Sequence, residues 1–130
     1  CNLCHLDQSL RWTLDALAEG WGAKIEPGDD WSDAYGEALE LPMVEVWLQH
    51  ETPIVRLVTA DAIARAPEPR AFAAELLSLL SDPYPNNRMF GMFALERVLD
   101  RRLEGEGYDP VAPPRDRQRQ IDALAAELAQ

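Results

Sequence analysis

The sequence predicts an all-α fold, a short solenoid of helical hairpins with a capping helix at its N-terminal and C-terminal ends. Apolar residues recur at spacings of three and four along most of the chain, which is the period of a helix with one buried side. Prolines then divide this pattern into helices of ordinary length. A chain of 130 residues has the size of one domain, so we expect residues 1–130 to form a single domain.

Residues 1–41 are expected to hold one helix and a loop. The helix should follow the first five residues at once and end near Gly20 and Gly22. One apolar stripe supports it, formed by Leu3, Leu6, Leu10, Leu14, Leu17 and Trp21. The loop, KIEPGDDWSDAYG, is rich in acids, and its Trp31 and Tyr35 are too large to leave in water. We also expect a short helix near 32–40.

Residues 42–103 predict two helical hairpins in series. Their helices correspond to PMVEVWLQHE, PIVRLVTADAIARA, EPRAFAAELLSLLSD and NNRMFGMFALERVLDRRL. The second helices of the two hairpins align at a constant offset: Arg56 and Arg88 lie 32 positions apart (88 minus 56), as do Pro53 and Pro85. A repeat of this length is typical of helical solenoids, in which each hairpin buries its surface against the next.

The stretches SDPYPNNRMFGMFAL at 81–95 and ETPIVRLVTADAI at 51–63 resemble the HEAT repeat family. The likeness lies in a proline-containing turn, then an arginine, then small residues and an aliphatic, and it covers about half the chain. It implies that Arg56 bridges to a turn acid of the neighbouring repeat, with Asp82 as the candidate. It also implies close helix packing at Thr59 and Gly91, where alanine is usual in the family.

Residues 104–130 are expected to form a connector and a C-terminal capping helix. The connector, GEGYDPVAPPRDRQ, is rich in glycine and proline. The helix presents one apolar side, made of Ile121, Leu124, Ala125 and Leu128.

Composition excludes several classes of function. The net charge of −11 argues against nucleic-acid partners and against anionic membrane surfaces. No apolar run reaches the length of a membrane span. The sequence lacks the glycine-rich phosphate and dinucleotide motifs and the serine elbow of hydrolases. We therefore do not expect an enzyme.

The chemistry of the chain is concentrated in its first five residues, CNLCH. Both cysteines of the protein, Cys1 and Cys4, lie here, and His5 follows them directly. Three ordinary interpretations remain open. They are a Cys1–Cys4 disulfide, a lipidated Cys1, and a metal site, although a zinc site would need a fourth ligand that the spacing does not supply.

The pattern C-x-x-C-H resembles the haem-attachment motif of c-type cytochromes. The resemblance is confined to residues 1–5. It implies one haem c per chain, held through thioethers at Cys1 and Cys4, with His5 as the proximal iron ligand. The protein would then be an electron carrier, exchanging electrons with redox partner proteins or other acceptors.

The distal iron ligand is predicted to be His50, the only other histidine. Imidazole is a strong iron ligand, and ligation on both sides favours electron transfer over oxygen chemistry. The alternative role for His50 is an interaction with a helix C-terminus. The methionines Met43, Met89 and Met92 are weaker candidates, and we expect Met89 and Met92 to fill the core beside Phe90 and Phe93.

A haem attached at the start of this sequence should lie at the edge of the subunit, because no residues precede the motif to enclose it. Residues 21–50 could cover it, through Trp31, Tyr35 and Trp47, or a neighbouring subunit could do so and supply His50. The latter predicts a homo-oligomer or a head-to-tail polymer with a chain of haems, resembling extracellular cytochrome filaments. We expect an exported protein, periplasmic or extracellular, whose signal peptide has been removed.

A different class of function competes with the cytochrome. The chain would then be a HEAT-like interaction module without a redox role, anchored as a lipoprotein through Cys1. The covalent haem distinguishes the two.

Overall fold

The computed structural model describes residues 1–23, 34–105 and 107–129. These residues form helices and turns, with two isolated β-bridges and no strand, so the all-α prediction is confirmed. The chain divides into two compact units, Cys1–Val46 and Trp47–Gln130, where the sequence predicted a single domain. Within the described residues, no helix is long and apolar enough to cross a lipid bilayer.

The first unit contains helix α1, Leu10–Trp21. Its first turn is capped by Ser9, whose hydroxyl accepts a hydrogen bond from the Trp12 N–H at 3.1 Å. Gly22, in the left-handed conformation with φ of 63°, ends the helix. The prediction that the helix follows the CNLCH motif at once was therefore wrong, because residues 1–8 form turns and Ser9 sets the start.

The rest of the first unit holds the N-terminal segment in place. A short 3-10 helix, η1, spans Gly36–Glu40, and α3 spans Met43–Leu48 and so runs across the boundary into the second unit. The backbone N–H groups of Met43 and Val44 donate to the carbonyls of Gln8 and Leu6, at 3.1 and 3.0 Å. The helix predicted near 32–40 is thus observed at 36–40, while Trp31 and residues 32–33 lie outside the described residues.

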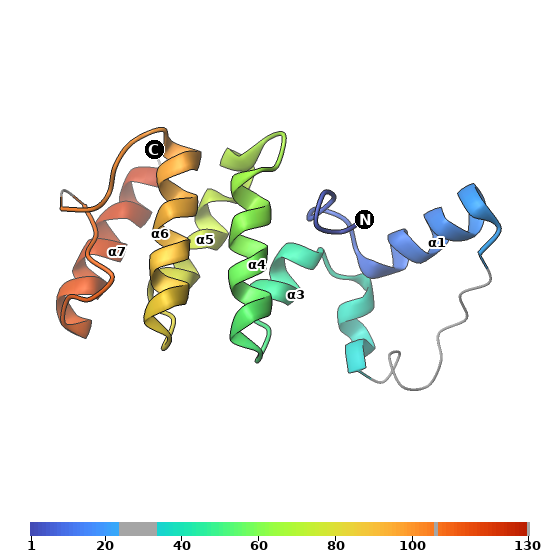
Figure 1. Ribbon diagram of the computed structural model, residues 1–130, viewed down its shortest axis with the longest axis horizontal. Coiled ribbons are helices and arrows are strands. Elements are labelled where there is room, and N and C mark those ends of the chain that lie inside the picture. Colours follow the sequence, from blue (N-terminus) through green and yellow to red (C-terminus); the bar gives the residue numbers. More distant parts are fainter. Residues whose placement is uncertain (24–33, 106, 130) are drawn as a thin grey trace. The chain divides into compact units, whose positions relative to one another are not determined.

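The second unit contains α4, Pro53–Ala64, the 3-10 helix η2, Pro69–Phe72, then α5, Ala73–Leu80, α6, Pro85–Leu99, and α7, Pro114–Leu128. Helices α4 and α6 lie side by side, α5 packs against α6, and α7 packs against α5 (Figure 1). The helices predicted for residues 42–103 are therefore present in the expected order. The buried core of this unit includes Ile63, Leu76, Leu79, Leu80, Met92 and Leu95.

Helix α6 approaches α5 closely at Gly91. A Cβ atom at this position would lie 2.9 Å from the Leu79 Cβ, closer than carbon atoms pack. The glycine is therefore required by the contact between α5 and α6, two helices of one predicted hairpin, whereas the resemblance to HEAT repeats implied a small residue for packing between adjacent repeats.

The segment between α6 and α7 is more than a connector. Tyr108 is buried, and its hydroxyl donates to the Leu80 carbonyl at the end of α5. Burial raises the pKa of this hydroxyl to about 12, against the smaller opposing effects of nearby arginines. The sequence showed this stretch only as rich in glycine and proline, which hid the anchoring tyrosine.

Candidate functional site

The CNLCH segment folds as a tight turn. The N–H groups of Cys4 and His5 both donate to the Cys1 carbonyl, at 2.9 and 3.1 Å. The residues of this turn differ in solvent exposure. Asn2 and Leu6 are buried, while Cys1, Cys4 and His5 are exposed. The three predicted haem-binding residues are therefore brought together on the outer side of one turn.

Asn2 fastens the inner side of this turn to α1. Its side-chain amide donates to the carbonyls of Gln8 and Ser9, at 3.1 and 3.3 Å. Its carbonyl oxygen accepts a hydrogen bond from the buried Thr13 hydroxyl at 2.6 Å. Asn2 is only 5% exposed, so these bonds form largely out of contact with water. The turn is thus fixed by a residue inside the motif, between the two cysteines.

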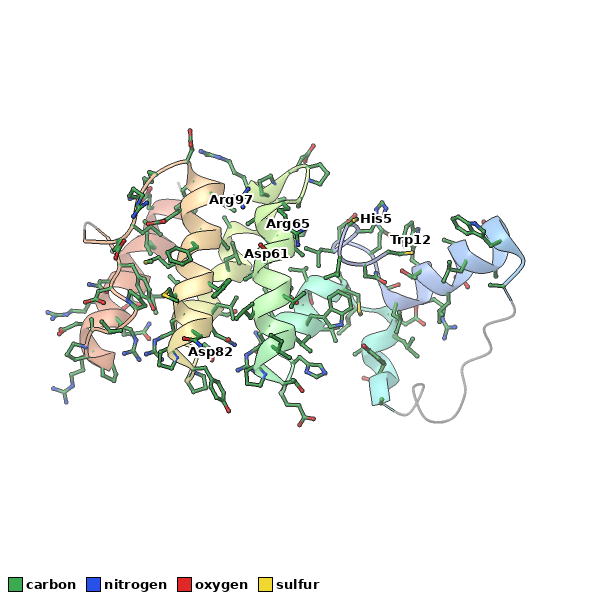
Figure 2. The ribbon with its side chains drawn as sticks, in the orientation of Figure 1. His5, Trp12, Asp61, Arg65, Asp82 and Arg97 are labelled. Atoms are coloured by element: carbon green, nitrogen blue, oxygen red, sulfur yellow. The ribbon has the colours of Figure 1, made fainter. Side chains whose placement is uncertain are left out.

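The His5 ring lies against Trp12 of α1. The two ring centroids are 5.0 Å apart and the planes are tilted by 50°, an arrangement that attracts aromatic rings (Figure 2). Leu3 is also exposed beside them in the sequence, at 47%. The surroundings of the imidazole are therefore partly apolar, although the ring itself remains accessible.

Both cysteines are free thiols and exposed. Within residues 1–23, 34–105 and 107–129, no three histidine, cysteine or acidic side chains converge where a metal ion could be held directly.

His50 lies in the second unit, in the turn before α4. Its Nδ1 accepts a hydrogen bond from the Thr52 N–H at 3.0 Å, and its carbonyl accepts one from Arg56. An acceptor Nδ1 carries no proton, so the neutral ring has its proton on Nε2. The structure thus gives His50 a turn-capping role in addition to the predicted ligand role, and the two roles compete for the same ring.

Asp82 occupies the equivalent place one repeat later, in the turn before α6. Its carboxylate accepts from the Tyr84 N–H at 2.8 Å, as His50 accepts from Thr52. It also accepts from Arg56, at 2.7 Å from Nε, and from the Asn87 amide at 3.1 Å. Burial alone would raise the pKa of Asp82, but these hydrogen bonds, led by Arg56, hold it below the ordinary value. The predicted bridge between Arg56 and Asp82 is therefore present.

The three methionines differ in access. Met43 and Met92 are buried, at 0% and 2% exposed, so neither thioether is available at the surface. Met89 lies on the exposed side of α6, with 36% of its surface accessible. The prediction that Met89 fills the core was therefore wrong. Its neighbours Phe90 and Phe93 are exposed as well. The MFGMF stretch is thus split, because only one side of α6 faces the core.

Sequence reasoning found Cys1, Cys4 and His5 but missed Asn2 and Thr13, which hold them. No spacing rule marks an asparagine between two cysteines as an anchor, since its partners are backbone carbonyls and a hydroxyl eleven residues on. Comparison with protein family models, with curated proteins and with solved structures gave no match.

Proposed function

We propose that the chain is a monohaem c-type cytochrome that transfers electrons. The observation that carries the proposal is the turn at residues 1–5, where Cys1, Cys4 and His5 are exposed on one side while Asn2 anchors the other. Covalently bound haem would supply a one-electron redox centre. The chain's residues would hold it: the two thiols through thioethers, and His5 through its imidazole.

Trp12 is suited to orient the proximal ligand. Its ring contacts His5 at a centroid distance of 5.0 Å, which restricts the rotation of the imidazole about its side-chain bonds. A restrained ring presents its nitrogen in one direction. Trp12 and the exposed Leu3 would also exclude water from part of the group attached to the motif.

His50 remains our proposed distal ligand, under a stated condition. Its Nδ1 accepts from Thr52, so binding iron through Nε2 requires the ring proton to move to Nδ1 and this hydrogen bond to break. Met89 is the exposed alternative among the methionines. Replacing His50 with alanine should convert a low-spin spectrum to a high-spin one and Met89→Ala should not. The reverse result would assign the distal position to Met89.

The proposal is tested by producing the exported chain in a host with the c-type maturation machinery. We expect an intact mass equal to the polypeptide plus one haem, and a Soret band that survives acid-acetone extraction. Replacing both Cys1 and Cys4 with serine should abolish covalent attachment, because no thiol remains to form a thioether. Ser9→Thr, which retains the helix cap, should leave attachment unchanged. A mass equal to the bare polypeptide would overturn the cytochrome.

We further propose that the carrier forms a head-to-tail homopolymer, which would bring the haem of one copy under the cover of the next. A stable haem-loaded monomer with six-coordinate iron would contradict this part. The alternative function, an interaction module anchored through Cys1, is favoured by the exposed apolar side chains of α4 and α6. A lipid adduct on Cys1 in place of haem would select it.

A further inference from the structure

An exposed apolar surface runs across α4 and α6. Ile54 and Val58 of α4 are 58% and 38% exposed, and Phe90 and Phe93 of α6 are 38% and 41% exposed. The N-terminal ends of the two helices share one groove of about 300 Å³, lined by residues that include Ile54 and Asn86. We call this surface the α4–α6 face. Contiguous exposed apolar side chains of this kind mark interaction sites.

The α4–α6 face has the same pattern on both helices. Ile54, Val58, Asp61 and Arg65 recur every three or four positions along α4, and Asn86, Phe90, Phe93 and Arg97 do so along α6. The face therefore carries four apolar side chains, Ile54, Val58, Phe90 and Phe93, with Asp61 among them, and an arginine at the C-terminal end of each helix. Figure 2 shows Arg65 and Arg97 at this end, and Asp82 at the other.

The two arginines differ in their partners. Arg65 pairs with Asp61 one turn earlier, at 2.5 Å. Among the residues that the structure describes, no carboxylate pairs with Arg97. An exposed arginine without a partner, in a chain of net charge −11, is available to an acid from outside.

The first unit carries a complementary surface on α1. Trp12 is 38% exposed, and Glu19 lies seven residues later on the same side of the helix, with Ala16 between them. Glu19 also has no ion-pair partner among the described residues. Two helical turns, about 10 Å, separate an aromatic residue from an acid here.

On the α4–α6 face, an aromatic residue and a cation have the same separation, because Phe90 and Arg97 are also seven residues apart. We propose that the α4–α6 face binds α1 of a second copy of this chain, laid parallel to α6. Trp12 then packs on Val58 and Phe90 while Glu19 pairs with Arg97. Ala16, being small, lets the helices approach. Trp and Arg are the side chains that most often dominate such contacts.

The two surfaces are different parts of the chain, so the contact is heterologous, and we propose that it repeats head to tail and does not close between two copies. The inference rests on the polymer in the proposed function, but it does not require haem. Because His5 contacts Trp12, each contact would place the CNLCH turn of one copy beside the second unit of its neighbour.

The test is a charge-reversal exchange on the full chain, with association measured by sedimentation over a range of concentrations. Arg97→Glu and Glu19→Arg should each weaken association about tenfold, because like charges then meet. The double variant should restore it to within about threefold of the original. Arg115→Glu, the same charge change on α7, is the control, and circular dichroism checks that each variant folds.

Restoration in the double variant supports the proposal. If Arg97→Glu leaves association unchanged, the α4–α6 face is not the contact between copies, and the proposal that the chain forms a polymer is unaffected. A chain that remains monomeric at every concentration overturns both. The intact mass reports haem attachment separately, so a failure of the contact is distinguishable from a failure of the cytochrome.

Discussion

Arg56 of α4 forms an ion pair with Asp82, 26 positions later, and also donates hydrogen bonds to the turn before its own helix. Its Nε and Nη2 donate to the carboxylate, at 2.7 and 3.3 Å, and its Nη1 donates to the backbone carbonyls of His50 and Glu51. The arginine thus ties the start of α4 to the start of α6. Since Asp82 is 5% exposed, this pair is shielded from the solvent that weakens surface ion pairs.

Replacing Asp82 with alanine should lower the free energy of unfolding by about 3 kcal/mol, because it leaves Arg56 buried without its anion. Urea denaturation followed by circular dichroism measures this loss. Asp61→Asn removes an exposed pair with Arg65 and should cost less than about 0.5 kcal/mol. Equal losses of unfolding free energy in the two variants would show that the buried ion pair contributes no more to stability than the exposed one.

The Asp82 contact should also make stability depend on pH. The folded-state pKa is held below the ordinary value of 3.8, so its contribution is complete above that value. It is lost as the pH falls through the lowered folded-state pKa. The difference in unfolding free energy between the original chain and Asp82→Asn should therefore be constant near neutrality and shrink below about pH 4. A difference that grows on acidification contradicts the lowered pKa.

Gly91→Ala should destabilise the second unit by about 1–3 kcal/mol, since the added Cβ meets Leu79 and α5 must shift. Helix propensity acts in the opposite direction, by about 1 kcal/mol, but does not offset the overlap. Gly20→Ala in α1 is the matched change in open space, and there the same substitution should be neutral or stabilising. Thermal unfolding compares the two.

Tyr108→Phe should cost about 1–2 kcal/mol, because the buried Leu80 carbonyl loses its donor while the ring remains. Tyr84→Phe changes an exposed ring and serves as the control. Denaturation in urea reports both. If the two variants unfold alike, the segment around Tyr108 is only a connector, as its composition suggested.

Asn2→Ala should loosen the CNLCH turn without unfolding the second unit. The Thr13 hydroxyl and the carbonyls of Gln8 and Ser9 lose their partner together. We expect faster amide hydrogen exchange across residues 4–13 and unchanged exchange in α6. Leu3→Ala, at an exposed position of the same turn, should leave both regions as they were.

Helix existence could be predicted from the sequence because proline positions and three-four spacing are local signals. Pro53 and Pro85 indeed stand at the first positions of α4 and α6. The start of α1 could not be predicted, because the apolar spacing continues back through Leu6 and Leu3. This pattern suggested a helix that begins before Ser9, the residue that caps it. Only Leu6 of the predicted stripe is buried, whereas Leu3 and Trp21 are exposed, at 47% and 79%, and the backbone before Ser9 forms turns.

The reactive residues of the candidate site could be predicted from the sequence, but the residues that hold them in place could not. Cys1, Cys4 and His5 are recognisable because thiol and imidazole chemistry is rare in this chain. The role of His50 as a turn cap required the structure, because it depends on a backbone N–H two residues away. A histidine and an aspartate can fill the same place only because both offer a side-chain acceptor at that distance.

Arg88 donates to the backbone carbonyls of Asp82 and Pro83 in the turn before its own helix, as Arg56 does in its turn. In the described part of the chain, no carboxylate pairs with it. Its Nε donates to the Pro110 carbonyl instead, at 2.7 Å. Pro110 therefore takes the place that a following hairpin's acid would need. A further hairpin after α6 would therefore have to displace the Pro110 carbonyl before its turn acid could reach the Arg88 Nε.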